Sequence, residues 1–172
     1  MLRIDLTRAD TEPLEFHERL DLPAETGGED VVSADAVELE GTAEKSERGF
    51  TIRGAARGAA RLRCVRCLTE FPFTFSETFE LSLLPAAGVP REEEVRLDRD
   101  ELDVRFYDEP ELDLVELAVE QFVLAVPMKA LCSEECLGLC PRCGADLNRF
   151  PCACRVEKDG RWAPLLDWRP RS

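Results

Sequence analysis

The sequence predicts an α+β fold, with an antiparallel sheet, one main helix and a cysteine-rich C-terminal tail bound to metal. Three observations lead to this prediction. Apolar and polar residues alternate in several short stretches before residue 86, a helical pattern begins near residue 113, and six of the eight cysteines follow residue 131. We therefore expect two parts, a β-rich domain over residues 1–131 and a zinc-binding tail over residues 132–172 that packs on it.

The sheet is predicted from alternation of apolar and polar residues. Strands are expected at residues 2–6, 37–42, 50–52 and 71–83. Pro72 cannot donate a ladder hydrogen bond, which places it at a strand start or at an edge. Short turns between the strands indicate antiparallel pairing, and three glycines would allow the sheet to curl into a partial barrel: Gly41, Gly54 and Gly58. The aromatic residues of the last strand are expected in the core rather than stacked on RNA bases: Phe71, Phe73, Phe75 and Phe79.

One helix is expected from about Asp113 to Ala125. Asp113 and Glu116 form a D-x-x-E start signal, and Pro127 ends the helix. Residues 91–111 are dominated by charge and are expected to form a solvent-facing connection. The tail after residue 131 lacks apolar periodicity, so burial alone cannot fold it.

The charge and the single histidine exclude several function classes. The net charge is −14, with −15 in residues 1–131 and +1 in the tail, which argues against a chain coated all over for nucleic acid. We expect a cytoplasmic protein without a membrane partner, because no signal peptide or membrane span is visible. His17 is expected to be an ordinary surface residue. Phosphate-binding and hydrolase motifs are missing from the sequence, so we expect neither enzymatic activity nor a small-molecule substrate.

The eight cysteines form four close pairs: Cys64 and Cys67, Cys132 and Cys136, Cys140 and Cys143, and Cys152 and Cys154. Tetrahedral zinc is typically held by four thiolates delivered as two such pairs. We expect two zinc ions with four cysteines each. The favoured grouping joins the last two pairs into a local tail site and the first two pairs into a site that ties the tail to the sheet.

Other thiol chemistry remains open at this point. Four-cysteine ligation also suits an iron–sulfur cluster. The alternative function from another class is a redox-active or metal-handling thiol protein that uses Cys64 and Cys67. Their C-x-x-C motif, however, lacks the βαβ setting of a thioredoxin-like site. Catalytic zinc is disfavoured because such sites keep an open position and mixed ligands.

Several blocks around the cysteines resemble a known family. They are Cys64–Leu68 before an aromatic strand, Asp113–Glu116 at a helix start, and the G-L-C-P-R-C-G block of Cys136–Asn148 followed by Cys152–Cys154. In this order they are similar to the bacterial YceD family, the large ribosomal RNA subunit accumulation proteins. The resemblance spans residues 30–166 and includes the ending D-G-R-W-A-P-L, in which Gly160 replaces a usual proline. It implies a role in accumulation of large-subunit ribosomal RNA, with no catalytic residue, and a tail site that is separable from the site of Cys64.

Two surfaces of opposite charge are candidates for the ribosomal partner. An acid-free stretch over residues 51–69 carries five arginines that would contact RNA phosphates: Arg53, Arg57, Arg61, Arg63 and Arg66. The alternative is that they pair across strands with Glu38, Glu40, Glu44 and Glu77. Residues 92–120 hold thirteen acids that would bind a basic ribosomal protein or act only as a solubilising linker. Trp162 and Trp168 are expected to cover the tail metal site.

Overall fold

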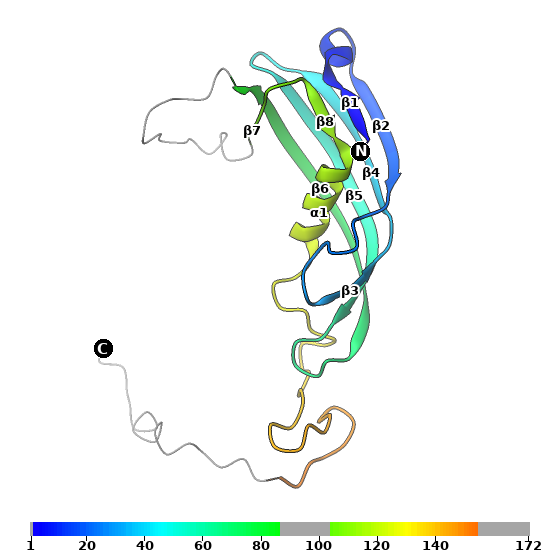
Figure 1. Ribbon diagram of the computed structural model, residues 1–172, viewed down its shortest axis with the longest axis vertical. Helices are drawn as coiled ribbons and strands as arrows, with labels where there is room; N and C mark the ends of the chain where they lie inside the picture. The colour runs from blue at the N-terminus through cyan, green and yellow to red at the C-terminus, as the bar shows by residue number, and fades with distance from the viewer. Residues whose placement is uncertain (1, 87–103, 155–172) are drawn as a thin grey trace, which may run out of the picture.

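A computed structural model describes residues 2–86 and 104–154 of the chain. These residues form one large sheet, one small sheet and one α-helix (Figure 1). The strands of the large sheet are β2 (Leu14–Leu20), β3 (Val31–Ala34), β4 (Val37–Lys45), β5 (Phe50–Arg63), β6 (Glu70–Pro85) and β7 (Val104–Tyr107). The small sheet pairs β1 (Arg3–Asp5) with β8 (Glu111–Asp113). A 3-10 turn, η1, covers Leu6–Asp10, and the helix, α1, covers Leu114–Ala125.

The large sheet is built around β5. Its strand order is β2-β4-β5-β6-β7, and β3 pairs with the end of β5 that β4 does not reach. All of these pairs are antiparallel except β6 with β7, which is parallel. The sheet is strongly curved but open, so the expectation of an α+β fold with an antiparallel sheet holds in the main, and the sheet does not close into a barrel.

Two paired glycines permit the close approach of the strands where the sheet curves. Gly41 of β4 lies opposite Gly54 of β5. A Cβ on Gly54 would lie 2.3 Å from the carbonyl oxygen of Glu40, and a Cβ on Gly41 would lie 2.6 Å from the carbonyl oxygen of Arg53. No side chain fits at such distances from backbone atoms, so both positions require glycine.

The core lies between the inner face of the sheet and α1. Leu114, Leu117 and Phe122 are at most 1% exposed on the helix side. On the sheet side, Leu39 and Ile52 are fully buried. The four phenylalanines of β6 belong to this core, Phe75 as a buried member and the other three as half-buried residues packed against it: Phe71, Phe73 and Phe79. Their predicted core role is therefore confirmed.

The helix agrees closely with the sequence prediction. Asp113 is its N-cap, and the Oδ1 atom accepts hydrogen bonds from the backbone N–H groups of Val115 at 3.0 Å and Glu116 at 3.2 Å. These two bonds satisfy donors that a helix start leaves without a partner. Pro127 follows the last turn, as expected.

The predicted solvent-facing connection at 91–111 is wrong over its second part. Residues 104–107 form β7, and Glu111 begins β8. Arg105 of β7 pairs with Glu116 and Glu120 of α1, which ties this charged segment to the helix. The first part of the predicted connection lies outside the described residues. The described residues contain no helix that is long and apolar enough to cross a membrane.

Candidate metal centre

The first cysteine group joins the β5–β6 turn to the segment after α1. Cys64 and Cys67 lie in the turn, and Cys132 and Cys136 follow the helix. Three of the four are buried, with Cys64 fully enclosed, while Cys132 is exposed. The three buried ones form a second cluster, packed against Leu131, Leu139 and Phe71, and Phe71 also packs against the main core.

The sulfur spacing in this group suits a tetrahedral metal ion. The Sγ atoms of Cys64 and Cys136 are 3.8 Å apart, and those of Cys67 and Cys132 are 3.6 Å apart. Four sulfurs at about 2.3 Å from a central zinc ion would be about 3.8 Å from one another. A disulfide would need about 2.05 Å, and all eight cysteines are free.

The second group is local to the tail. Cys140, Cys143, Cys152 and Cys154 have all four Sγ atoms within 4.8 Å of one another. Cys152 is 3.4 Å from both Cys140 and Cys143 between Sγ atoms. Only Cys140 is buried, so this group is the more accessible of the two. The structure thus places the eight cysteines in the same two sets of four that the spacing predicted, and each set could hold a metal ion; that these residues bind metal stays a prediction.

The two C-x-R-C turns have the same backbone geometry. In the first, the N–H of Cys64 donates to the Thr69 carbonyl at 2.9 Å and the N–H of Leu68 donates to the Cys64 carbonyl at 2.8 Å. The tail turn repeats both bonds, from Cys140 to Ala145 at 2.8 Å and from Gly144 to Cys140 at 2.9 Å. The residue after the second cysteine has a positive φ in each case, 61° for Leu68 and 71° for Gly144.

This shared turn prepares its first cysteine for ligation. Burial raises the pKa of the Cys64 thiol, but three backbone N–H hydrogen bonds outweigh burial and lower the pKa to about 6. Their donors belong to Cys132, Cys67 and Arg66. Backbone N–H bonds from Cys143 and Arg142 likewise lower the pKa of Cys140 to about 6. Since the thiolate is the form that binds metal, each turn presents one sulfur that is already ionised near neutral pH.

Another sulfur in each group, that of Cys132 or Cys154, has a raised pKa instead. A hydrogen bond with the Cys67 side chain, followed by burial, raises the pKa of Cys132 to about 12. Contact with the Cys152 side chain raises the pKa of Cys154 to about 12. A second negative charge close to the first is unfavourable without a cation between them. A divalent cation would remove this repulsion, so the chemistry of both groups fits a metal ion.

Asn148 connects the two groups and was not singled out by the sequence. Its Nδ2 atom donates to the Sγ of Cys136 at 3.5 Å and to the Oδ1 of Asp146 at 2.7 Å. Its Oδ1 accepts from the N–H of Leu137 at 2.8 Å. Asn148 belongs to the loop of the tail group, yet it hydrogen-bonds a sulfur of the first group. Such outer contacts orient metal ligands.

Arg66 is placed apart from the predicted RNA-contacting stripe. It lies in the first cysteine turn, where its guanidinium donates to the carbonyl of Cys136 at 2.7 Å and its own carbonyl accepts from the N–H of Leu139 at 3.1 Å. Gly138 packs against it, since a Cβ there would lie 3.1 Å from the Arg66 carbonyl oxygen. Arg66 therefore holds the tail against the first turn.

The other four arginines share one exposed face of β5, as the alternation predicted: Arg53, Arg57, Arg61 and Arg63. Three of them are paired with glutamates of the neighbouring strands. Arg53 contacts Glu44 at 3.4 Å and Glu80 at 3.0 Å, and Arg57 contacts Glu40 at 2.8 Å. Arg61 lies 4.0 Å from Glu70. The alternative of cross-strand pairing is therefore realised for these three, partly with glutamates other than those expected; contact with RNA stays a prediction.

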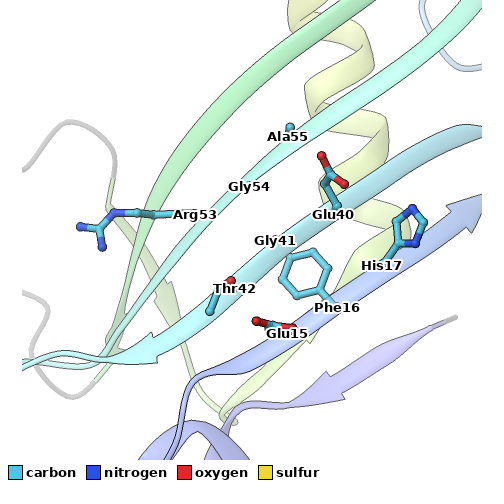
Figure 2. A pocket seen from close by; sticks show the side chains of 9 residues that line it. All are labelled: Glu15, Phe16, His17, Glu40, Gly41, Thr42, Arg53, Gly54 and Ala55. Carbon is cyan, nitrogen blue, oxygen red and sulfur yellow. The ribbon is translucent and has the colours of Figure 1, made fainter.

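A shallow hollow of about 690 Å³ lies on this same face of the sheet (Figure 2). The paired glycines of β4 and β5 contribute to its lining, beside the side chains of His17 and Glu40. His17 is exposed, as expected. Glu40 is paired with Arg57 at 2.8 Å, and His17 is the one histidine of the sequence.

Some predicted features lie outside the described residues. They include the seven acids of residues 92–103, Trp162, Trp168 and the D-G-R-W-A-P-L ending. The division into a domain over 1–131 and a tail over 132–172 also stays a prediction.

Comparison with known proteins supplies the family. A protein of Mycobacterium bovis, described as uncharacterized, is 27% identical over 176 residues, covering 96% of this chain and 80% of the relative. The chloroplastic large ribosomal RNA subunit accumulation protein YCED homolog 1 of Arabidopsis thaliana is 37% identical over 60 residues, covering 34% of this chain and 19% of the relative. No solved structure matches. The family model for the large ribosomal RNA subunit accumulation protein YceD matches residues 52–168, which include both cysteine groups, and the chain therefore belongs to the YceD family.

Proposed function

We propose that this chain is a non-enzymatic cytoplasmic factor that supports accumulation of large-subunit ribosomal RNA and that two structural zinc ions hold its tail in place. The observation that carries the proposal is that the family match spans residues 52–168 and encloses both four-cysteine groups. Each group has the sulfur spacing of a closed tetrahedral site, which leaves no open position for chemistry. The zinc ions would serve the shape of the molecule and would not act on a substrate.

The ribosomal partner is proposed to be a basic protein. The arginines of β5 are suited to phosphate, but glutamates of β4 and β6 lie within 4.0 Å of three of them. An RNA strand would have to replace these ion pairs and approach carboxylates on both sides. The acidic surplus of residues 1–131 instead favours a cationic partner.

The biological role is tested by removing the gene and measuring the ratio of large- to small-subunit ribosomal RNA. The ratio should fall and be restored by the complete chain. Complementation with Cys64→Ser/Cys67→Ser should fail, whereas Arg53→Gln/Arg57→Gln/Arg61→Gln/Arg63→Gln should restore the ratio. An unchanged ratio in the deletion strain would overturn the proposed role, and failure of the arginine variant alone would favour RNA as the partner.

The zinc proposal is tested by metal analysis of anaerobically purified protein. We expect two zinc ions per chain, and one after Cys140→Ser/Cys143→Ser. Detection of iron and sulfide, together with visible absorbance, would show that the protein holds an iron–sulfur cluster instead of zinc. Metal-free protein with a rapidly reacting Cys64 or Cys67 would favour the redox alternative.

A further inference from the structure

In the part of the chain that the structure describes, one edge of β6 has no neighbouring strand for most of its length. Residues 70–83 of β6 pair with β5 on one side. On the other side, β7 pairs only with residues 82–85. Among the residues that the structure describes, no strand lies beside residues 71–81 on this second side. Backbone N–H and C=O groups along such an edge can pair with an extended segment of another chain.

A groove runs between this edge and α1. It has a volume of about 450 Å³ and is lined by Phe79 and Leu81 of β6 and by Leu117 and Leu124 of α1, among others. Leu124 is 74% exposed, and Val123 beside it is 47% exposed. Glu120 and Gln121 of α1 line the groove as well, so a strand added to β6 would place every second side chain over a mixed polar and apolar surface, on the same face as Glu77.

The edge and the groove are acidic. β6 contains three glutamates and no lysine or arginine. Glu70 and Glu80 pair with arginines of β5 on the outer face of the sheet. Glu77 is exposed and lies opposite the fully buried Ala56, so its side chain is on the face that α1 covers. Glu116 and Glu120 of α1 add two more acids, and Arg105, which pairs with both, is the one basic residue that lines the groove among the described residues.

These charges favour some binding partners of the β6 edge over others. A second copy joined antiparallel through β6, with Glu77 at the centre, would bring Glu77 opposite its own counterpart, and opposed like charges destabilise strand pairs. RNA would meet carboxylates without exposed lysines along β6. We propose that the open edge of β6 binds an extended lysine- and arginine-rich segment of a partner protein as an added strand; this rests on the proposed function, since it names the surface where the basic partner docks.

The experiment uses the full, metal-loaded chain and a fluorescent synthetic peptide in which lysine alternates with valine over the length of residues 71–81. Fluorescence anisotropy should detect binding. Amide hydrogen exchange should slow in residues 71–81 when the peptide is added, because an added strand protects backbone N–H groups. A peptide with glutamate in place of lysine should not bind.

Charge reversal locates the site. Glu77→Lys should weaken peptide binding at least about fivefold, because it replaces an attractive cross-strand pair by a repulsive one. The matched control is Glu18→Lys, an exposed glutamate of β2 at the opposite edge of the same sheet, which should change affinity by less than about twofold. Glu77→Gln provides a milder variant if Glu77→Lys does not fold, and an intermediate loss is expected from it.

Several results would overturn the proposal. They are absence of peptide binding, unchanged exchange in β6, equal losses in the Glu77 and Glu18 variants, and tighter binding of a single-stranded RNA of matched length than of the lysine peptide. The proposed function fails separately, through the ribosomal RNA ratio. If Glu77→Lys loses the peptide but still restores the ratio in the deletion strain, the docking surface is wrong for that role and the role itself stands.

Discussion

Leu68 adopts a backbone conformation that favours glycine. Its φ is 61°, and it occupies the same place in the first C-x-R-C turn as Gly144 in the second. A leucine in this region is strained by about 1–2 kcal/mol. The side chain is 58% exposed, so it gains little from packing in return.

Leu68→Gly should therefore stabilise the metal-loaded protein by up to about 1 kcal/mol, after allowance for the entropy that glycine loses on folding. Gly144→Ala, which introduces the same strain into the second turn, should lower the free energy of unfolding by about 1 kcal/mol. Urea unfolding of both variants measures the two changes. A destabilised Leu68→Gly would show that the leucine side chain makes contacts that outweigh the strain.

Asn148 should couple the two metal groups. Asn148→Ala removes the donor to the Cys136 sulfur and the acceptor for the Leu137 N–H. We expect the zinc affinity of the first group to fall by about 10-fold or more, as for other outer contacts of metal ligands. Chelator competition on protein that carries Cys140→Ser/Cys143→Ser measures the first group alone. Arg149→Ala, which removes only the ion pair with the Oδ2 atom of Asp146, is the control and should change the affinity much less than Asn148→Ala does.

The helix start is the element for which the sequence was most informative. Asp113→Ala should lower the free energy of unfolding by about 1 kcal/mol, because two N–H groups of α1 lose their acceptor. Asp113→Asn should retain most of this stability, since its side-chain oxygen can accept the same bonds. Equal losses in both variants would assign the effect to the ion pair with Arg3, at 3.7 Å, rather than to the cap.

The elements that could be predicted have strong local signals. α1 has a cap, an acidic first turn and a terminating proline, and β6 has sixteen residues of near-regular alternation. β7 and β8 have three or four residues each and highly charged neighbours, so their strand state depends on partners distant in sequence. The parallel pairing of β6 with β7 likewise depends on the path of the chain between the two strands, and no local sequence pattern indicates it. The close spacing of the cysteines predicted the two groups of metal ligands. No local pattern indicated a role for Asn148, because its partner is a sulfur twelve residues away.

The described residues form two clusters of buried side chains, which meet at Phe71. The main core lies between the sheet and α1, and the first cysteine group forms its own cluster. Removal of metal should therefore leave the sheet folded and release the segment after residue 131. Limited proteolysis after chelation should cut between residues 137 and 154 first. Early cleavage within β4 or β5 would show that the metal ions also stabilise the sheet.

Acid should also release the metal, and with it the segment after residue 131. Cys64 and Cys140 have pKa values lowered to about 6, so their contribution to metal binding and stability is present above their ordinary pKa and is lost as the pH falls through about 6. Cys132 and Cys154, with pKa values raised to about 12, take up protons readily once the metal is weakened. Zinc release followed with a colorimetric chelator between pH 8 and about 5 should rise steeply near pH 6. A flat profile would contradict the thiolate assignment.

The contact between Cys64 and Cys136 has a consequence for how the chain is made. The two residues are 72 positions apart, and a metal ion between them would close a loop that contains β6, β7, β8 and α1. Closing a loop of this length lowers the conformational entropy of the unfolded chain, which stabilises the folded state by several kcal/mol, as a disulfide does. During synthesis the turn at Cys64 emerges long before its partners, whereas the tail group spans only residues 140–154 and completes itself locally. An ion that ties the ends of this loop together would therefore be the last constraint that the sheet and helix acquire, and until then the nascent chain would carry only the first two thiols of the site.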